Sequence, residues 1–352
     1  MLRDGKGFSA PVTLASATTT DIGGQNSLAV EISGTTTITS FGTSYNGPRF
    51  LRFTGALTLT HNSTSLNLPG AANITTVAGD TAIAFPNLAL NGWNVVNHTR
   101  ANGASFPSGQ LFGCTMSTAG SSTTMSISAG SAADSTNAVL MQLSAIAKTT
   151  SAWVVGTAQG GLDTGSIANS TWYHFYVIRR PDTGVVDVVF STNATTPTLP
   201  ANYTQYRRIG SGKTNGSAQW VKFVQRGDLF LLDVPTLDIN STAPGSTAQA
   251  GTLASVPSGI VVDAMLNIGI LESGGSDLAY VSPFTVSDMA PSLSAAPGVS
   301  VKSHSSTAWG WSPITVTTDI NREVRFRLAT GSATSLFRGV TLGWIDTRGR
   351  NA

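Results

Sequence analysis

Short runs of alternating apolar and polar residues follow one another along most of the chain. Between residues 25 and 105 the runs are SLAVEIS, TTTITSFG, RFLRFTG, ALTLTH, SLNLPG, NITTVAG, TAIAF and WNVVNHT, with Gly, Asn, Asp or Pro at their ends. A period of two with turn residues at this spacing is typical of strands in a sandwich, a barrel or a solenoid. In ALTLTH, the alternation places Leu57, Leu59 and His61 on one face of a strand.

The part of the chain after residue 105 contains the clearest hairpin signal. Residues 172–178 (WYHFYVI) and 185–190 (VVDVVF) flank the sequence RRPDTG, which has Pro, Asp and Gly at turn-compatible positions. Residues 139–147 (VLMQLSAIA) have helical propensity, but their brevity and setting favour a strand. Further strands are predicted at 220–224, 229–232, 260–266, 314–317, 322–328 and 340–345.

Composition strengthens the case for β-structure. Ser and Thr make up a quarter of the 352 residues, charged residues only 11%, and Glu occurs three times. A helix-rich fold is disfavoured because Glu, Lys, Gln and Arg normally fill exposed helix positions. Disorder is not expected for a chain that is 41% hydrophobic with a net charge of +2. We therefore predict an all-β fold, in which a short-strand β module precedes a jelly-roll-like β-sandwich.

The chain is expected to have three regions. Residues 1–20 are predicted to form an extended arm, residues 21–105 an N-terminal trimeric β module, and residues 106–352 a C-terminal β-sandwich domain. The junction is placed near ANGASFPSGQ, where a stretch of low charge begins. The β module has few large apolar residues for a thick core of its own, which predicts burial between chains there.

Several classes of protein are disfavoured by what the sequence lacks. Cys114 is the single cysteine, so neither an intrachain disulfide framework nor a thiolate metal site is expected. The chain has no apolar run of 18 residues, and no apolar stretch follows the charged N-terminus, so neither a membrane span nor a signal peptide is predicted. The small basic excess near the C-terminus is too weak to indicate a nucleic-acid partner.

Signatures of catalysis are also missing. The motifs HExxH and GxSxG do not occur, and His174, inside a hydrophobic strand, is interpreted as a packed residue. The acid pairs available for glycoside hydrolysis are Asp182 with Asp187 and Asp228 with Asp233. Asp182 is better interpreted as a turn former, and Asp187 as an exposed strand residue. We expect a protein that is not an enzyme, with no catalytic residues, metal or cofactor.

Aromatic residues give the better functional lead. Trp309 and Trp311 are separated by one Gly, so on an extended chain both rings point the same way, about 7 Å apart. Flat sugar faces stack on such rings, although paired Trp residues also fill sandwich edges or subunit seams. Arg325 and Arg327 share a strand face and can pair with acidic sugars or phosphate. The candidate carbohydrate-binding residues are Trp309, Trp311, Trp220, Tyr203, Arg325 and Arg327.

Long segments of the chain resemble proteins of one viral family. Residues 1–105 contain RDGKGFSAPVTLASA, LPGAANITTVAGDTA and GWNVVNHTRANG, and the rest of the chain contains ISAGSAADSTN, WVVGTAQGGLDTGSIANSTWYHFYVIRRPDTG and the terminal GWIDTRGR. Together they closely resemble bacteriophage and prophage tail fibre or tail-associated proteins. The resemblance implies a structural protein of the virion tail and supplies no catalytic residues.

The expected function follows from this resemblance together with the aromatic residues. We expect a homotrimeric tail fibre or spike that binds other virion proteins and attaches to host-surface carbohydrate. Arg3, Asp4 and Lys6, in the arm, are the candidate virion-attachment residues. Two alternatives stay open. One is a purely structural head-fibre, collar or decoration protein, and the other is a polysaccharide depolymerase.

Overall fold

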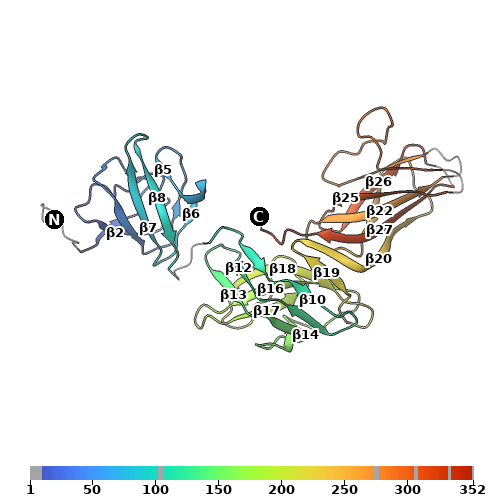
Figure 1. Cartoon of the computed structure of the whole chain (residues 1–352), viewed down its shortest axis with the longest axis horizontal. Helices are drawn as coiled ribbons and strands as arrows, with labels where there is room; N and C mark the ends of the chain where they lie inside the picture. Colours follow the sequence, from blue (N-terminus) through green and yellow to red (C-terminus); the bar gives the residue numbers. More distant parts are fainter. Residues whose placement is uncertain (1–9, 102–105, 273–276, 305–307, 332–333, 351–352) are drawn as a thin grey trace. The chain divides into compact units, whose positions relative to one another are not determined.

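The computed structural model describes residues 10–101, 106–272, 277–304, 308–331 and 334–350 (Figure 1). Nearly all regular structure in this part of the chain is β-strand, which confirms the predicted all-β class. The helical exception among the described residues is η1 (Pro69–Ala71), a single 3-10 turn. Residues 139–147, whose pattern left helix and strand open, form β13 (Leu140–Leu143) and the start of β14 (Ile146–Ala152).

The chain divides into two compact units. Unit 1 consists of Met1–Gln110 and Ala133–Leu140, and unit 2 of Leu111–Ala132 and Met141–Ala352. The predicted junction at residue 105 lies close to the end of the first segment. The return of residues 133–140 to unit 1 was not predicted, because nothing in the local pattern distinguishes that segment.

Unit 1 begins with three parallel strands, β1 (Val12–Ala15), β2 (Ala29–Ser33) and β3 (Arg49–Phe53). Val30 of β2 is aligned with Val12 on one side and with Leu51 on the other. The segments between these strands carry a second row of parallel bridges, which join Thr19 to Ser40 and Ile38 to Leu59. Two parallel rows in successive turns of chain are the geometry of stacked solenoid coils.

An antiparallel pair of strands extends the same sheet. β7 (Thr81–Asn87) pairs with β3 and with β8 (Gly92–Thr99), and β5 (Leu66–Asn67) runs parallel to β8. The sheet order is therefore β1-β2-β3-β7-β8-β5, and β4 (Thr58–Leu59) pairs with β6 (Ile74–Thr75) in a separate two-stranded sheet. Of the three architectures that the sequence pattern left open, this region begins as a solenoid and ends as an antiparallel hairpin.

Unit 1 buries a core within a single chain, contrary to the expectation that it lacks one. Most of the core side chains are aliphatic, and Trp93 is fully buried with its Nε1 donating to the carbonyl oxygen of Gly42 at 3.1 Å. Leu57 and Leu59 join this core as the alternation predicted. The other members are Ile22, Val30, Ile32, Ile38, Phe41, Leu51, Phe53, Leu66, Leu68, Ala82, Ala84 and Val95.

The predicted arm is only partly separate from this unit. Residues 12–15 form β1 of the sheet and Thr19 makes a bridge to the next coil, so an extended arm over all of residues 1–20 is wrong. Residues 12–15 form a strand because they pair in parallel with the edge of β2 that β3 leaves free. Arg3, Asp4 and Lys6 lie outside the described residues.

Unit 2 contains a mixed seven-stranded sheet in its first half (Figure 1, green to yellow). The predicted hairpin is confirmed, with β16 and β17 antiparallel and Phe175 aligned with Phe190. The order is β10-β11-β14-β15-β17-β16-β18. The strands not yet bounded are β10 (Met116–Ser117), β11 (Thr124–Ile127), β15 (Gln159–Leu162), β16 (Trp172–Arg179), β17 (Val186–Ser191) and β18 (Gln205–Lys213). A three-stranded sheet, β13-β12-β9, uses β9 (Leu111–Gly113) and β12 (Gly130–Ala133).

The second half of unit 2 is a β-sandwich of two antiparallel sheets. Five strands run in the order β19-β20-β27-β22-β25, and four in the order β21-β26-β23-β24. The rings of Phe326 and Phe337, one from each sheet, stack with centroids 4.5 Å apart. The strands are β19 (Phe223–Arg226), β20 (Leu229–Ser241), β21 (Gln249–Thr252), β22 (Asp263–Leu271), β23 (Leu278–Ser282), β24 (Val301–Lys302), β25 (Gly310–Thr317), β26 (Glu323–Leu328) and β27 (Leu336–Ile345).

One hydrophobic cluster runs through both halves of unit 2. Its centre is aromatic, since the ring of Trp220 lies against Tyr173, Phe175 and Phe190 at centroid distances of 5.9, 5.2 and 5.2 Å. Rings of this size bury a large area and fix one another's orientation. The region predicted as a single sandwich domain is thus one unit with a continuous core, assembled from more sheets than a simple sandwich has.

Candidate functional site

The solvent-facing side of the five-stranded sheet carries Trp311 in the same cross-strand row as an arginine. Trp311 of β25 is aligned with Gly269 of β22, and Gly269 is aligned with Arg338 of β27. Ile268 and Ile270, on either side of Gly269, are fully buried, so the alternation places this row on the outer face. Asn240 of β20 is aligned with Arg338 and completes a row across four strands.

Trp309 and Trp311 stack on each other. Their ring centroids are 5.5 Å apart and their planes differ by 26°. The expectation of two side-by-side rings spanning neighbouring sugars is therefore wrong, because each ring covers part of the other. Gly269 makes this packing possible, since a Cβ at that position would lie 2.7 Å from Cζ3 of Trp311.

A guanidinium group adds a third layer to this stack. Cζ of Arg338 lies 5.5 Å from the ring centroid of Trp309, a distance at which a cation is attracted to the ring face. Nη1 of Arg338 is buried and has no hydrogen-bond partner among the described residues. Trp311 is 46% exposed. The site thus combines an open indole surface with a guanidinium group that packs on the indole stack.

A shallow hollow adjoins the two indole rings. It is lined by residues of β24, by the segment just before it and by the start of β25, and Lys302 and His304 supply its ionisable groups. A flat apolar surface next to scattered polar groups is what a sugar ring contacts. We define the glycan surface as Trp309, Trp311, Arg338, Asn240, Lys302 and His304.

Arg325 and Arg327 do not belong to this surface. They share a face of β26, as predicted, but both hold the chain segment that follows β23. Nη1 of Arg325 donates to the carbonyl oxygen of Val286 at 2.9 Å, and its Cζ lies 5.1 Å from the ring of Phe284. Nη1 of Arg327 lies 2.6 Å from Oδ2 of Asp288. With these partners in place, neither guanidinium group presents a free fork to an acidic sugar.

Trp220 and Tyr203 are core residues. Trp220 is 0% exposed and its Nε1 donates to the carbonyl oxygen of Thr123 at 3.2 Å. Tyr203 is 5% exposed and lies edge-on to Trp153, at a centroid distance of 5.3 Å. A sugar needs an open ring face, so the prediction that these two side chains contact carbohydrate is wrong for this conformation.

The carboxylates considered for hydrolysis are engaged in separate ion pairs. Asp182 forms the predicted turn, accepts from the backbone N–H of Thr183 and pairs with Arg180 at 2.7 Å. Asp187 is 1% exposed and lies 2.8 Å from Nζ of Lys148, so its interpretation as an exposed residue was wrong. The second candidate acid pair, Asp228 with Asp233, is likewise engaged in separate ion pairs. Asp228 contacts Arg348 at 2.8 Å, and Asp233 contacts Lys222 at 2.9 Å.

His174 and Cys114 are buried within unit 2. Nδ1 of His174 lies 2.9 Å from Oγ of Ser211, and burial together with the nearby charge of Arg208 lowers the pKa of His174 to about 4. Burial raises the pKa of the Cys114 thiol to about 11. A neutral imidazole in the core fits the interpretation of His174 as a packed residue, and a buried, protonated thiol such as that of Cys114 is a poor nucleophile.

The described residues show neither a metal-binding cluster nor a membrane-spanning helix. No group of three or more His, Cys, Asp or Glu side chains there is arranged to hold a metal ion. The same residues include no helix with the length and apolar character of a membrane span.

Neither a scan against protein-family models nor a search of curated sequences finds a significant match.

Proposed function

We propose that this chain is a structural protein of a tailed-phage virion, a homotrimeric tail fibre or spike that attaches to host-surface glycans. The observation that carries the proposal is the glycan surface, where an exposed indole, a guanidinium group and an amide lie in one row on the open face of a sheet. The resemblance of long sequence segments to tail fibre proteins supplies the biological setting.

The chemistry of the row favours a sugar over other surface ligands. The exposed part of Trp311 offers a flat apolar face to the C–H groups of a pyranose ring. Arg338 lies two strands from Trp311 in the same row and Asn240 lies one strand further, and both side chains carry N–H donors for ring oxygens and hydroxyl groups. Because rigid strands hold these side chains, little conformational entropy is lost when a ligand binds.

The rest of the chain is consistent with a virion part. Unit 1 is a short stack of coils, and such stacks are extended by repetition in fibrous proteins. The surface has few charged residues, and the resulting low density of Lys and Glu side chains suits a protein that must resist proteases. A head fibre, collar or decoration protein would share these properties, but it would have no need of an open aromatic row.

The depolymerase alternative has weaker support. Hydrolysis of a glycosidic bond requires two carboxyl groups that face one substrate. Asp182, Asp187, Asp228 and Asp233 each have a basic partner of their own. We therefore propose that the protein acts by binding.

The test uses an array of bacterial surface polysaccharides probed with the purified full-length chain. Trp311→Ala should weaken binding to the glycans that the native protein recognises by about tenfold or more, which corresponds to roughly 1.4 kcal/mol. Phe112→Ala is the matched control, because Phe112 is also a highly exposed aromatic residue on a strand of unit 2. Absence of binding by the native protein, or equal binding by the Trp311 variant, would reject the proposal.

A further inference from the structure

Two ionisable side chains of the glycan surface lie next to each other beside the tryptophans. Val301 and Ser303 are buried, whereas Lys302 and His304 are exposed. This alternation places the side chains of Lys302 and His304 on the same outer side of an extended segment, about 7 Å apart. Both residues line the hollow of about 580 Å³ that adjoins the indole rings.

A glycine brings this segment against the tryptophans. Gly310 separates Trp309 from Trp311 in the sequence. A Cβ on Gly310 would lie 1.9 Å from the carbonyl oxygen of Lys302 and 3.6 Å from the backbone nitrogen of His304. A residue with a side chain at this position would push the two segments apart. The close approach therefore places Lys302 and His304 beside the indole pair.

The accessible charge of the hollow is that of Lys302. The residues that line the hollow include no Asp or Glu, and no ion pair joins Lys302 or Arg338 to a carboxylate of the described residues. The guanidinium group of Arg338 packs on Trp309, and its Nη1 is buried. Arg338 thus adds positive charge to the surface, while Lys302 offers its ammonium group to a ligand.

The acid beside this segment does not neutralise the ammonium group by direct contact. Asp277 lies opposite Ser303, whose N–H donates to the carbonyl oxygen of Asp277 at 2.9 Å. Because Lys302 and Ser303 point to opposite sides, the carboxylate of Asp277 lies on the buried side of this strand pair. Asp277 is 4% exposed, and its carboxylate accepts from the backbone N–H groups of Thr330 and Gly331.

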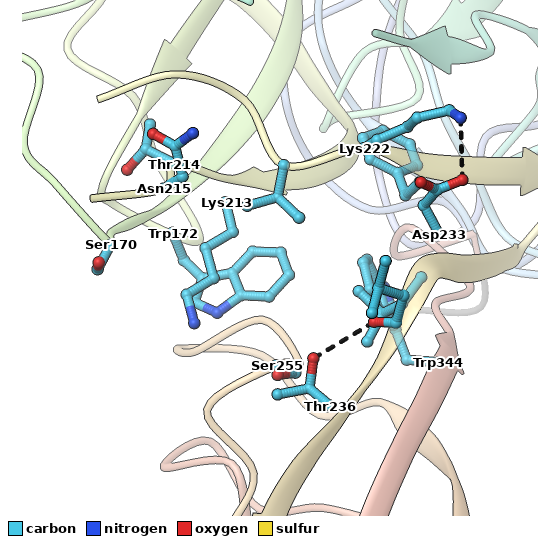
Figure 2. A pocket seen from close by; sticks show the side chains of 14 residues that line it. Ser170, Trp172, Lys213, Thr214, Asn215, Lys222, Asp233, Thr236, Ser255 and Trp344 are labelled. Atoms are coloured by element: carbon cyan, nitrogen blue, oxygen red, sulfur yellow. Dashed lines mark hydrogen bonds and ion pairs between the residues drawn. The ribbon is translucent and has the colours of Figure 1, made fainter. Parts of the chain in front are cut away.

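A second hollow of unit 2, shown in Figure 2, lacks this combination of an open ring and a free cation. Trp172 and Lys213 line it, but Trp172 is 5% exposed and Nζ of Lys213 donates to the carbonyl oxygen of Ala254 at 2.8 Å. The ammonium group of Lys222, also in that lining, pairs with Asp233 at 2.9 Å (Figure 2). Trp311, by contrast, is 46% exposed beside Lys302.

This arrangement favours a sugar with one negative charge. A neutral sugar would use the indole face and leave the ammonium group without a partner, whereas a carboxylate accepts charge-assisted hydrogen bonds from it. A phosphate monoester carries a charge closer to −2 and three acceptor oxygens, which one accessible ammonium group matches less well. His304 offers a ring nitrogen to a neighbouring hydroxyl group.

We propose that the glycan surface selects a sugar unit that carries a carboxylate, as in a uronic acid. The ring stacks on the exposed part of Trp311, and the carboxylate accepts from Nζ of Lys302. The inference rests on the proposed glycan binding and adds the charge of the sugar that is bound.

Matched oligosaccharides test the charge requirement. In titration calorimetry, the full-length chain should bind trigalacturonate roughly fivefold or more tightly than its trimethyl ester, which has the same rings without the charges. High salt should remove most of this difference, because it screens exposed charges. Equal affinity for the acid and the ester would overturn the inference and leave the proposed glycan binding intact.

Variants of Lys302 assign the charge to one residue. Lys302→Met should bind the acid and the ester with equal affinity, and Lys302→Arg should keep the preference for the acid. Arg226→Met is the matched control, because Arg226 is an exposed basic residue on β19, at the opposite edge of the five-stranded sheet from β25. A preference that survives in Lys302→Met, or that Arg226→Met also abolishes, would reject the assignment.

Two further measurements separate the sugar ring from its charge. Trp311→Ala should weaken binding of the acid and of the ester by similar factors, since both stack on the same ring. Inorganic phosphate should not compete with trigalacturonate at equal concentration, and competition would show a simple anion site and contradict the inference. If the native chain bound neither the acid nor the ester nor any polysaccharide of the array, the proposed function would fail together with this inference.

Discussion

The two units stabilise buried basic side chains in different ways. In unit 1 the guanidinium group of Arg49, a residue that is 2% exposed, donates to main-chain carbonyl oxygens of two connecting segments. In unit 2 the buried charges of Lys148 and Arg208 pair with Asp187 and Asp346. The carbonyl oxygens that accept from Arg49 belong to Ile22, Gly23, Gln25, Asn46, Gly47 and Pro48.

Carbonyl partners in unit 1 and carboxylate partners in unit 2 predict different responses of the two units to mutation and to acid. Arg49 joins segments from successive coils, so it replaces hydrogen bonds that short strands cannot supply. Carbonyl oxygens do not titrate in the accessible pH range, whereas carboxylates and imidazoles do. The contribution of Arg49 to unit 1 should therefore not change with pH, whereas unit 2 should lose stability as its buried groups take up protons.

Arg49→Met should have the largest effect. Several buried carbonyl oxygens lose their donor, each at a cost of about 1–3 kcal/mol, and we expect unit 1 to be destabilised by about 4 kcal/mol. Hydrogen-exchange mass spectrometry should show faster exchange in the peptides of unit 1. Arg52→Met is the control on the same strand, since Arg52 is exposed and pairs with Glu31, and it should change stability by less than about 0.5 kcal/mol. Equal effects of the two variants would show that the carbonyl cluster is unimportant.

Asp346→Asn should destabilise unit 2 by about 3 kcal/mol. Asp346 accepts two hydrogen bonds of 2.7 Å from Arg208, and removal of its charge leaves a largely buried guanidinium group without a counter-ion. Burial alone would raise the pKa of Asp346, but the hydrogen bonds and charge of Arg208 outweigh it and hold that pKa below the usual value. Urea unfolding measures the change. Asp182→Asn, which alters an exposed pair, should leave the unfolding midpoint in place, and an equal loss from both variants would contradict this account.

Acid should weaken unit 2 by about 2 kcal/mol between pH 7 and pH 5. The pKa of His174 is lowered to about 4 in the folded protein, whereas the unfolded chain takes up this proton near pH 6.5. The unfolded state therefore binds more protons as the pH falls from 6.5 to 4, and stability falls with it. Urea unfolding at several pH values should show this slope.

His174→Gln should remove most of that slope. In unit 1, hydrogen bonds from His98 and from backbone N–H groups hold the pKa of Asp80 below its usual value against the opposing effect of burial. The contribution of Asp80 is fully present above pH 3.8 and stays intact in this range. An unchanged slope in the His174 variant would exclude this histidine as the acid-sensitive group.

Local sequence patterns predicted most of the strands. The hairpin of β16 and β17, the alternating strand β26 and the strands β2, β3, β7 and β8 of unit 1 follow from apolar alternation and turn residues alone. The predicted run TTTITSFG forms isolated bridges at Ile38 and Ser40 and no named strand. The same patterns wrongly predicted that Asp187 is exposed, because an acidic residue within a strand usually faces solvent. Its partner Lys148 lies on β14, far away in the sequence, and a local pattern does not reveal such a partner.

The candidate site was predicted in part. Trp309 and Trp311 were found from their spacing, but Arg338 and Asn240 were missed because they come from other strands whose register is set by pairing. Trp220 and Tyr203 were wrongly included, since an aromatic residue in a polar stretch can belong either to a core or to a surface. The residues next to Trp220 and Tyr203 in the sequence do not distinguish a core position from a surface position.

The sequence by itself determined the all-β class, the positions of turns and the alternation of inner and outer side chains. These follow from local backbone preferences, which act over a few residues. Only the tertiary structure decided that unit 1 starts as stacked parallel coils, that Gly269 makes room for Trp311 beside Arg338, and that Lys213 lines a cavity beside Trp172. Each of these depends on strand register and sheet packing, and both are set by contacts between residues that are distant in the chain.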